Sequence, residues 1–282
     1  MLPKFRKTFI LVAVVAALST GCRYQKEYSK ITEAGNQYAN AVDKLLDKAG
    51  HLQADYSAEK LLSDDKLANQ TIENYKDAKK DTEEQLKKIA GMREHNQLLQ
   101  KYFQKLRQLA RSNAPEQIQA EIDGIVGNIQ TISSNYSFDD KGIIGRVGKL
   151  VIDSKIDGAL RKELEKRDNT ILKELTIQQD MINSLRGSME HKFELLKSLR
   201  ETRLLIEPLT DEEPIEDAQA WIEEHKQMLF LDKHIAELKE ACNALGDFKE
   251  IYKASVEGNI NSESIDNALE DIGTFLALID KK

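Results

Sequence analysis

Apolar residues recur at alternating steps of three and four residues along most of this chain, and this spacing constrains its fold more than any other feature. The first series comprises Tyr28, Ile31, Gly35, Tyr38, Val42, Leu45, Ala49, Leu52 and Tyr56. On an α-helix such positions share one face, the face that packs against other helices. Comparable series continue as far as Ile279, without any run that alternates like a β-strand. The spacing therefore predicts an all-α protein.

Helix-breaking residues fall between the periodic segments. Pro115, Pro208 and Pro214 are the only prolines after residue 22, and none of them interrupts a series. Ser63 opens one segment as a cap, and Gly258 closes another. The predicted helices span about 26–54, 63–112, 115–133, 142–206, 214–257 and 263–280. Segments of this length predict one domain over 22–282, an elongated antiparallel helical bundle with coiled-coil-like packing.

The composition agrees with long amphipathic helices. Charged residues make up 32% of the chain and aromatic residues 6%, with only 4 prolines and 14 glycines in 282 residues. Beyond the first 21 residues, 38 Lys and Arg face 48 Asp and Glu, a net charge of −10. Nucleic acids and anionic lipid surfaces both require a basic face. The charge therefore argues against nucleic acid as a partner.

The first 21 residues have the organisation of a secretion signal. Lys4, Arg6 and Lys7 form a basic head, and an uncharged apolar run follows from Phe9 to Leu18. A helix that crosses a bilayer needs about 20 apolar residues, which is more than this run supplies. Residues 1–21 are therefore predicted to be a cleaved signal peptide.

The sequence Leu18-Ser19-Thr20-Gly21 followed by Cys22 resembles the end of a bacterial lipoprotein signal peptide. In that family a peptidase cuts before the cysteine, and the new N-terminus carries acyl chains such as palmitate. Thr20 and Gly21 match the small residues of the family pattern, whereas Ser19 stands where an aliphatic residue is favoured. The resemblance implies a lipid on Cys22 and, through it, attachment to a membrane.

Arg23 bears on the destination of such a lipoprotein. In enteric bacteria an Asp after the cysteine commonly retains lipoproteins in the inner membrane, so Arg23 implies the outer membrane in a host with two membranes. In other hosts the resemblance implies the outer face of the plasma membrane. Cleavage by a general signal peptidase and an uncleaved anchor stay open as alternatives. If Cys22 carries lipid, Cys242 has no partner in its own chain and is predicted to be a small buried residue, with an intermolecular disulfide as the alternative.

One segment suggests contact with a membrane or a partner. Residues 142–152 have glycines at every third position at their start, and several apolar residues share a helical face beside basic ones. The apolar residues proposed for this contact are Ile143, Ile144, Val147 and Val151. Such a segment can lie on a membrane surface, or it can pack closely against neighbouring helices through its glycines.

No motif in the sequence indicates catalysis. None of the five histidines has an acidic residue three positions before it, as a helical metal site would, so surface or rim positions are predicted for them. The acidic clusters lack calcium-loop spacing. We therefore expect no enzyme activity, metal or cofactor.

Three hypotheses about function follow. The first is a lipid-anchored cell-envelope protein with a structural or protein-interaction role, binding a protein partner or itself through helical faces. The second is a sensor or carrier of a small ligand, held in a cleft between helices, and the third is a membrane-active protein that uses residues 142–152. Aromatic residues that could line such a cleft, or equally pack in the core, are Tyr28, Tyr38, Tyr75, Tyr102, Phe103 and Trp221.

Overall fold

The computed structural model describes the backbone of residues 5–66, 71–135, 158–211, 213–229 and 248–258, with isolated positions between 152 and 156 and between 242 and 273. Side chains are described for most of these from residue 32 onward. Within these residues the chain forms helices and turns and no strand, so the predicted all-α fold is confirmed.

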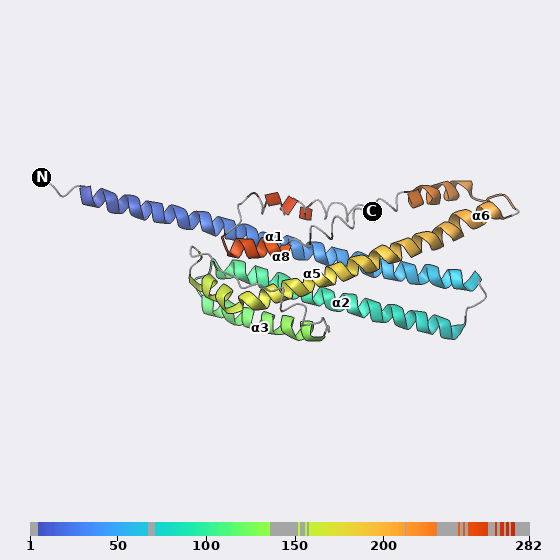
Figure 1. Cartoon of the computed structure of the whole chain (residues 1–282), viewed down its shortest axis with the longest axis horizontal. Coiled ribbons are helices and arrows are strands. Elements are labelled where there is room, and N and C mark those ends of the chain that lie inside the picture. Colours follow the sequence, from blue (N-terminus) through green and yellow to red (C-terminus); the bar gives the residue numbers. More distant parts are fainter. Residues whose placement is uncertain are drawn as a thin grey trace. The chain divides into compact units, whose positions relative to one another are not determined.

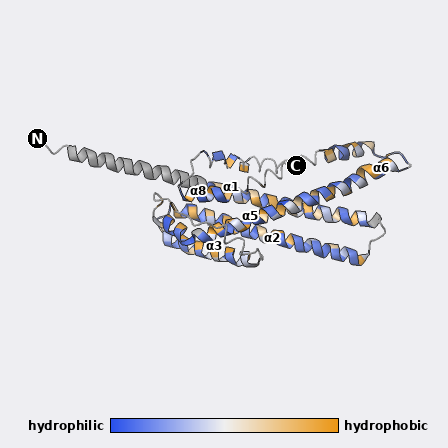
Figure 2. Ribbon diagram, viewed as in Figure 1, coloured by the Kyte–Doolittle hydropathy of each residue, from blue (hydrophilic) through white to orange (hydrophobic). Residues whose placement is uncertain are grey.

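Seven helical elements are defined in the described residues, and residues 218–229 are helical as well. The elements are α1 (Phe5–Lys66), α2 (Ile72–Leu109), α3 (Pro115–Asn135), α5 (Gly158–Glu201), the π-helical turn η1 (Thr202–Ile206), α6 (Glu207–Thr210) and α8 (Phe248–Val256) (Figure 1). Hydrophobic and hydrophilic residues are interspersed along α2, α3, α5 and the coloured part of α1 (Figure 2), as expected for helices with one buried face.

The chain divides into two compact units, each assembled from segments distant in sequence. Unit 1 comprises Met1–Ala39, Leu98–Ile177 and Asp247–Asp271, and unit 2 comprises Asn40–Gln97, Gln178–Gly246 and Ile272–Lys282. Helices α1, α2 and α5 contribute residues to both units. A single domain over 22–282 stays a prediction.

The core of unit 1 is built around five buried aromatic rings: Tyr38 of α1, Tyr102 and Phe103 of α2, and Phe248 and Tyr252 of α8. The Tyr38 and Phe248 rings are stacked with centroids 4.2 Å apart. Phe103 meets the edges or faces of Tyr102, Phe248 and Tyr252 at 5.7–5.8 Å. Burial raises the pKa of the Tyr38 hydroxyl above its ordinary value. The rings lock α8 against α1 and α2.

Helices in unit 1 pack in both directions. A tight turn after α2 leads into Pro115, and Lys105 pairs with Glu121, so α2 and α3 are antiparallel. By contrast, α3 and α5 run in the same direction, because Asp123 pairs with Lys166 and, farther along both helices, Ser133 donates a hydrogen bond to Glu174. The antiparallel arrangement expected for the bundle thus holds for α2 with α3, while α3 and α5 are parallel.

Unit 2 contains an antiparallel pairing of α1 with α2. Thr82 Oγ1 lies 2.8 Å from Ser57 Oγ, and Arg93 reaches Asp43. Two of the enclosed polar side chains in this unit bond to each other: the Gln178 amide donates a hydrogen bond to Asn96 Oδ1 at 2.6 Å. His95 is also completely buried, so the prediction that the histidines lie at the surface or rim is wrong for His95.

Several predicted helix bounds are wrong. The helix expected to end near Ala54 continues to Lys66, so Ser63 lies in its last turn instead of capping a new helix, and α2 begins at Ile72. The buried Glu59 lies in this region and pairs with Arg200 of α5 and Arg203 of η1, and these contacts favour the continued helix over the weak local signals. Cys242 is fully buried, as predicted.

The segments around the later prolines also differ from prediction. Helical structure continues past Pro208 to Thr210, because η1 lets Glu207 N–H bond to Thr202 O and places Pro208 in the first turn of α6, where its missing N–H costs little. The next helix begins at residue 218, not at 214, since the Asp217 carboxylate caps it through Ala220 N–H at 2.9 Å.

Candidate interaction surface

The residues singled out in the sequence fall largely outside the described structure. Cys22 lies within α1, but its side chain is not among those described. Ile143, Ile144, Val147 and Val151 all lie outside the described residues. None of the helices in the described part of the chain is long and apolar enough to cross a membrane.

The aromatic residues predicted to line a cleft or to pack in the core lie in different environments. Tyr38, Tyr102 and Phe103 are packed in the unit 1 core, whereas Tyr75 is 53% exposed on α2. Trp221 is the exception, because it lines a cavity in unit 2. The sequence therefore identified one aromatic residue of the candidate surface among several that serve the core.

A buried carboxylate fixes the end of α5. Glu59 of α1 is 8% exposed, and its two oxygens accept hydrogen bonds from Arg203 at 2.7 and 3.0 Å and from Arg200 at 3.1 Å. The hydrogen bonds from Arg203, together with those from Arg200, hold the pKa of Glu59 below its ordinary value against the opposing effect of burial. Since Arg203 belongs to η1, this cluster anchors the π-helical turn to α1.

Trp221 attaches residues 218–229 to the same turn. Its indole Nε1–H donates a hydrogen bond to the carbonyl of Leu205 in η1 at 3.2 Å. Its ring stacks on that of His225, with centroids 5.2 Å apart and planes 6° from parallel. Leu205 of η1 and Met228 of the helix at residues 218–229 are both buried. A π-helical turn frequently marks a functional position, and here it helps to shape a cavity.

This cavity, the acidic pocket, has a volume of about 480 Å³ and lies among η1, α6 and residues 213–224. Among the described residues of its lining Arg203 is the only basic one, and Trp221 contributes an aromatic wall. The acidic residues in the lining are Glu207, Asp211, Glu213, Glu216, Asp217 and Glu224. The pocket is suited to a cationic group with an apolar stem.

Large apolar side chains are exposed on the same elements. We define the apolar rim as Ile206, Leu209, Ile222 and Leu229, which are 49%, 60%, 41% and 65% exposed. Single exposed apolar residues are ordinary, but several on neighbouring elements are typical of a surface that contacts another molecule. The acidic pocket and the apolar rim together form the candidate interaction surface.

A second cavity of about 380 Å³ lies between α1 and α2 in unit 2. Its lining is mostly polar and includes Gln53, Asp64, Asp77 and Asp81. Gln53 is 3% exposed, and its side-chain oxygen has no hydrogen-bond partner. Like the predicted cleft this cavity lies between helices, but none of the described aromatic residues predicted to line the cleft is in its lining.

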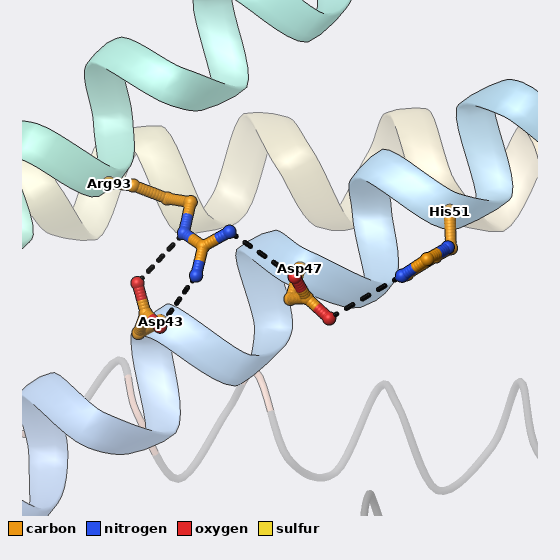
Figure 3. Close-up of polar contacts among 4 residues, drawn as sticks. All are labelled: Asp43, Asp47, His51 and Arg93. Carbon is orange, nitrogen blue, oxygen red and sulfur yellow. Dashed lines mark hydrogen bonds and ion pairs between the residues drawn. The ribbon is translucent and has the colours of Figure 1, made fainter.

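A further polar cluster joins α1 and α2. Figure 3 shows Arg93 of α2 between two aspartates of α1: its guanidinium contacts both oxygens of Asp43 at 2.8 and 2.9 Å and Asp47 at 3.2 Å. His51, 76% exposed, lies 3.7 Å from Asp47. The hydrogen bonds that Arg93 donates to Asp43, together with the negative charge of Asp43, raise the pKa of Arg93. Two-pronged pairing of this kind fixes helix register, so we assign the cluster a structural role.

The Glu59 cluster and the apolar rim were both missed in the sequence. Glu59 is separated from Arg203 by 144 residues, so no local pattern connects them. The rim residues follow the same helical spacing as core residues, and spacing alone does not separate a buried apolar face from an exposed one. Among the described residues no group of three or more His, Cys, Asp or Glu side chains is placed to hold a metal ion.

Replacing Glu59 with glutamine is expected to lower the free energy of unfolding by about 1–2 kcal/mol at pH 7, because charge-assisted hydrogen bonds to both arginines are weakened. The pKa of Glu59 is lower in the folded protein, so this stabilisation is present above the pKa of the unfolded chain and is lost as pH falls through the folded value. Urea unfolding at pH 7 and pH 3, with Glu84→Gln on an exposed position as control, measures both effects. Equal stability of the two variants at pH 7 would contradict the anchoring role.

Comparison of the chain with models of protein families, with curated proteins and with solved structures gave no match. The role of the candidate interaction surface is therefore argued from its geometry alone.

Proposed function

We propose that this chain is a lipid-anchored protein of the cell envelope with a non-catalytic role in binding another protein. The observation that carries the proposal is that the elements which line the acidic pocket in unit 2 also expose the apolar rim. Exposed leucine and isoleucine side chains on the elements that line an aromatic-walled depression are typical of protein contact surfaces. The Cys22 pattern supports attachment to a membrane, and the acidic composition makes direct binding to an anionic lipid surface unfavourable.

Site-specific photo-crosslinking tests the interaction role. A photoreactive amino acid placed at Leu209 or Leu229 in the full chain, in the producing cells, is expected to crosslink one discrete protein at both positions. The control position is Glu94, which is exposed on α2 in the same unit. Crosslinks that are absent at Leu209 and Leu229, or that are the same at Glu94, would refute binding through this surface.

Metabolic labelling with a fatty-acid analogue tests the anchor separately. The full chain is expected to become labelled, and Cys22→Ala is expected to remove the label. A chain that stays unlabelled, or a variant that keeps the label, would contradict lipid attachment at Cys22.

A second candidate function is binding of a small ligand in the cavity between α1 and α2. The mostly polar lining of this cavity, which includes Gln53, Asp64 and Asp77, favours a polar ligand. Native mass spectrometry of the freshly purified chain is expected to show an additional bound mass that Gln53→Leu removes. The membrane-active hypothesis concerns residues outside the described structure, and loss of liposome binding in Ile144→Asp is its test.

A further inference from the structure

The segment that forms the candidate interaction surface is strongly acidic. Residues 201–229 contain nine acidic and two basic residues, a net charge of −7. Both basic side chains already face carboxylates, since Arg203 is bonded to Glu59 and Lys226 lies 3.7 Å from Glu223. The surface therefore offers an excess of negative charge to whatever binds it.

The apolar rim has the spacing of a helix-binding surface. Ile206 and Leu209 are three residues apart, and Ile222 and Leu229 are seven residues apart within residues 218–229, which form a single helix. Side chains separated in this way lie on one side of a helix. An amphipathic helix binds such a surface through its own apolar stripe.

The acidic pocket is shaped for a long basic side chain. One face of the Trp221 ring is covered by His225, while the residue also lines the pocket beside Leu204 and Ile215. Methylene groups of lysine or arginine can lie along these apolar walls while the cationic end reaches the carboxylates. A cationic side chain also offsets the negative charge of these carboxylates, which an acidic or a neutral side chain does not.

We propose that the acidic pocket and the apolar rim bind a cationic amphipathic helix of a protein partner, with a lysine or arginine in the pocket and the apolar stripe on the rim. The proposal rests on the proposed function and specifies the partner's chemistry. A second copy of this chain is disfavoured, because its body has a net charge of −10 after the first 21 residues. An anionic lipid surface is disfavoured by the same charge.

The fluorescence of Trp221 tests the proposal directly, because it is the only tryptophan in the chain. The protein is the full chain carrying Cys22→Ser, so that no lipid contributes to binding. The probes are an 18-residue helical peptide of leucine and lysine without aromatic residues, the same peptide with glutamate in place of lysine, and a scrambled lysine peptide with no apolar stripe. We expect a saturable change in emission with the lysine helix, at least about tenfold weaker binding of the other two, and weaker binding of the lysine helix as salt is raised.

Matched charge variants distinguish peptide binding at this surface from general attraction of the basic peptide to an acidic protein. Glu213→Lys/Glu216→Lys changes two exposed acids of the pocket, and Glu84→Lys/Glu94→Lys changes two exposed acids of α2 in the same unit by the same charge. We expect about tenfold weaker peptide binding for the pocket variant and less than about twofold for the control. Leu209→Gln/Leu229→Gln is expected to weaken binding by about fivefold. Circular dichroism checks that each variant keeps its helix content.

Equal binding of the lysine and glutamate helices, or equal loss in both charge variants, would overturn the proposal. Binding of the rim to zwitterionic vesicles instead of the peptide would overturn it as well. If the crosslinks at Leu209 persist while the lysine helix fails to bind, the proposed function stands and the partner's chemistry is different. If the helix binds but no protein is crosslinked in cells, the surface has the proposed chemistry and the proposed function fails.

Discussion

Replacing Phe103 with alanine is expected to lower the free energy of unfolding by about 3–5 kcal/mol, the usual cost of removing a fully buried phenylalanine ring. Phe103 is 0% exposed and contacts three other rings from α2 and α8. Its loss opens a cavity where α8 packs on the rest of unit 1. Urea unfolding followed by circular dichroism measures the change.

Gly35 provides an internal check on this prediction. A Cβ added at Gly35 lies 2.7 Å from Phe103 Cγ, closer than two carbon atoms pack. We therefore expect Gly35→Ala to destabilise the protein by about 1–3 kcal/mol. In the Phe103→Ala background the obstruction is gone, and the same change is expected to be neutral or stabilising by up to about 1 kcal/mol, since alanine favours the helix. Additive losses in the double variant would show that the two residues do not meet.

The second large effect concerns Glu163, a carboxyl group enclosed in unit 1. Its side chain is 1% exposed, one oxygen accepts a hydrogen bond from Arg167 Nε at 2.5 Å, and the other has no hydrogen-bond partner. Burial raises the pKa of Glu163 to about 7, although the nearby ammonium of Lys166 acts in the opposite direction. The folded protein thus binds this proton more tightly than the unfolded chain does.

The sign of the resulting pH dependence follows from that difference. Below the pKa that Glu163 has in the unfolded chain, its carboxyl is protonated in both states. As pH rises above that value toward 7, the folded state loses stability, because the carboxyl ionises more easily in the unfolded chain than at its buried site. Glu163→Gln mimics the protonated form at every pH. We expect its advantage over the natural chain to grow between pH 5 and pH 8, up to about 3 kcal/mol.

Urea unfolding of Glu163→Gln and of the natural chain at several pH values between 5 and 8 measures the difference in their free energies of unfolding. The contributions of other titrating groups cancel in this difference. Glu165→Gln is the matched control, since Glu165 lies on the same helix and is 49% exposed. Its difference from the natural chain is expected to stay constant. A constant difference for Glu163→Gln would show that the carboxyl is ionised throughout this range.

The fold class was predictable because helical spacing persists through most of the chain. The start of α3 at Pro115 was also predictable, since proline is well tolerated only in the first turn of a helix. The continuation of α1 past Ala54 was not, because it depends on Glu59 meeting arginines more than 140 residues away. Likewise, the enclosed pair of Asn96 and Gln178 arises from tertiary packing, which local propensity does not encode.

The candidate surface was predictable only in part. The acidic residues around Asp211 and Trp221 are visible in the sequence, but the acids lack the spacing of a known site and the tryptophan is equally compatible with a cleft or a core. Only the structure shows that Trp221 bonds to Leu205 and that Leu209 and Leu229 stay exposed. Exposure depends on which neighbouring segments cover a helix face, and periodicity gives no information about that.

The π-helical turn η1 makes the orientation of the candidate surface tolerant of a change in chain length. A π-helical turn holds one residue more than an α-helical turn, so the extra residue is absorbed within η1 and the segments after it keep nearly the direction they have across a regular turn. A chain lacking one residue between Thr202 and Ile206 can close this turn as an α-helix, whereas the same deletion inside α5 rotates the following residues by about 100°. Comparison of the two deletions therefore separates the orientation of the surface from its composition and charge.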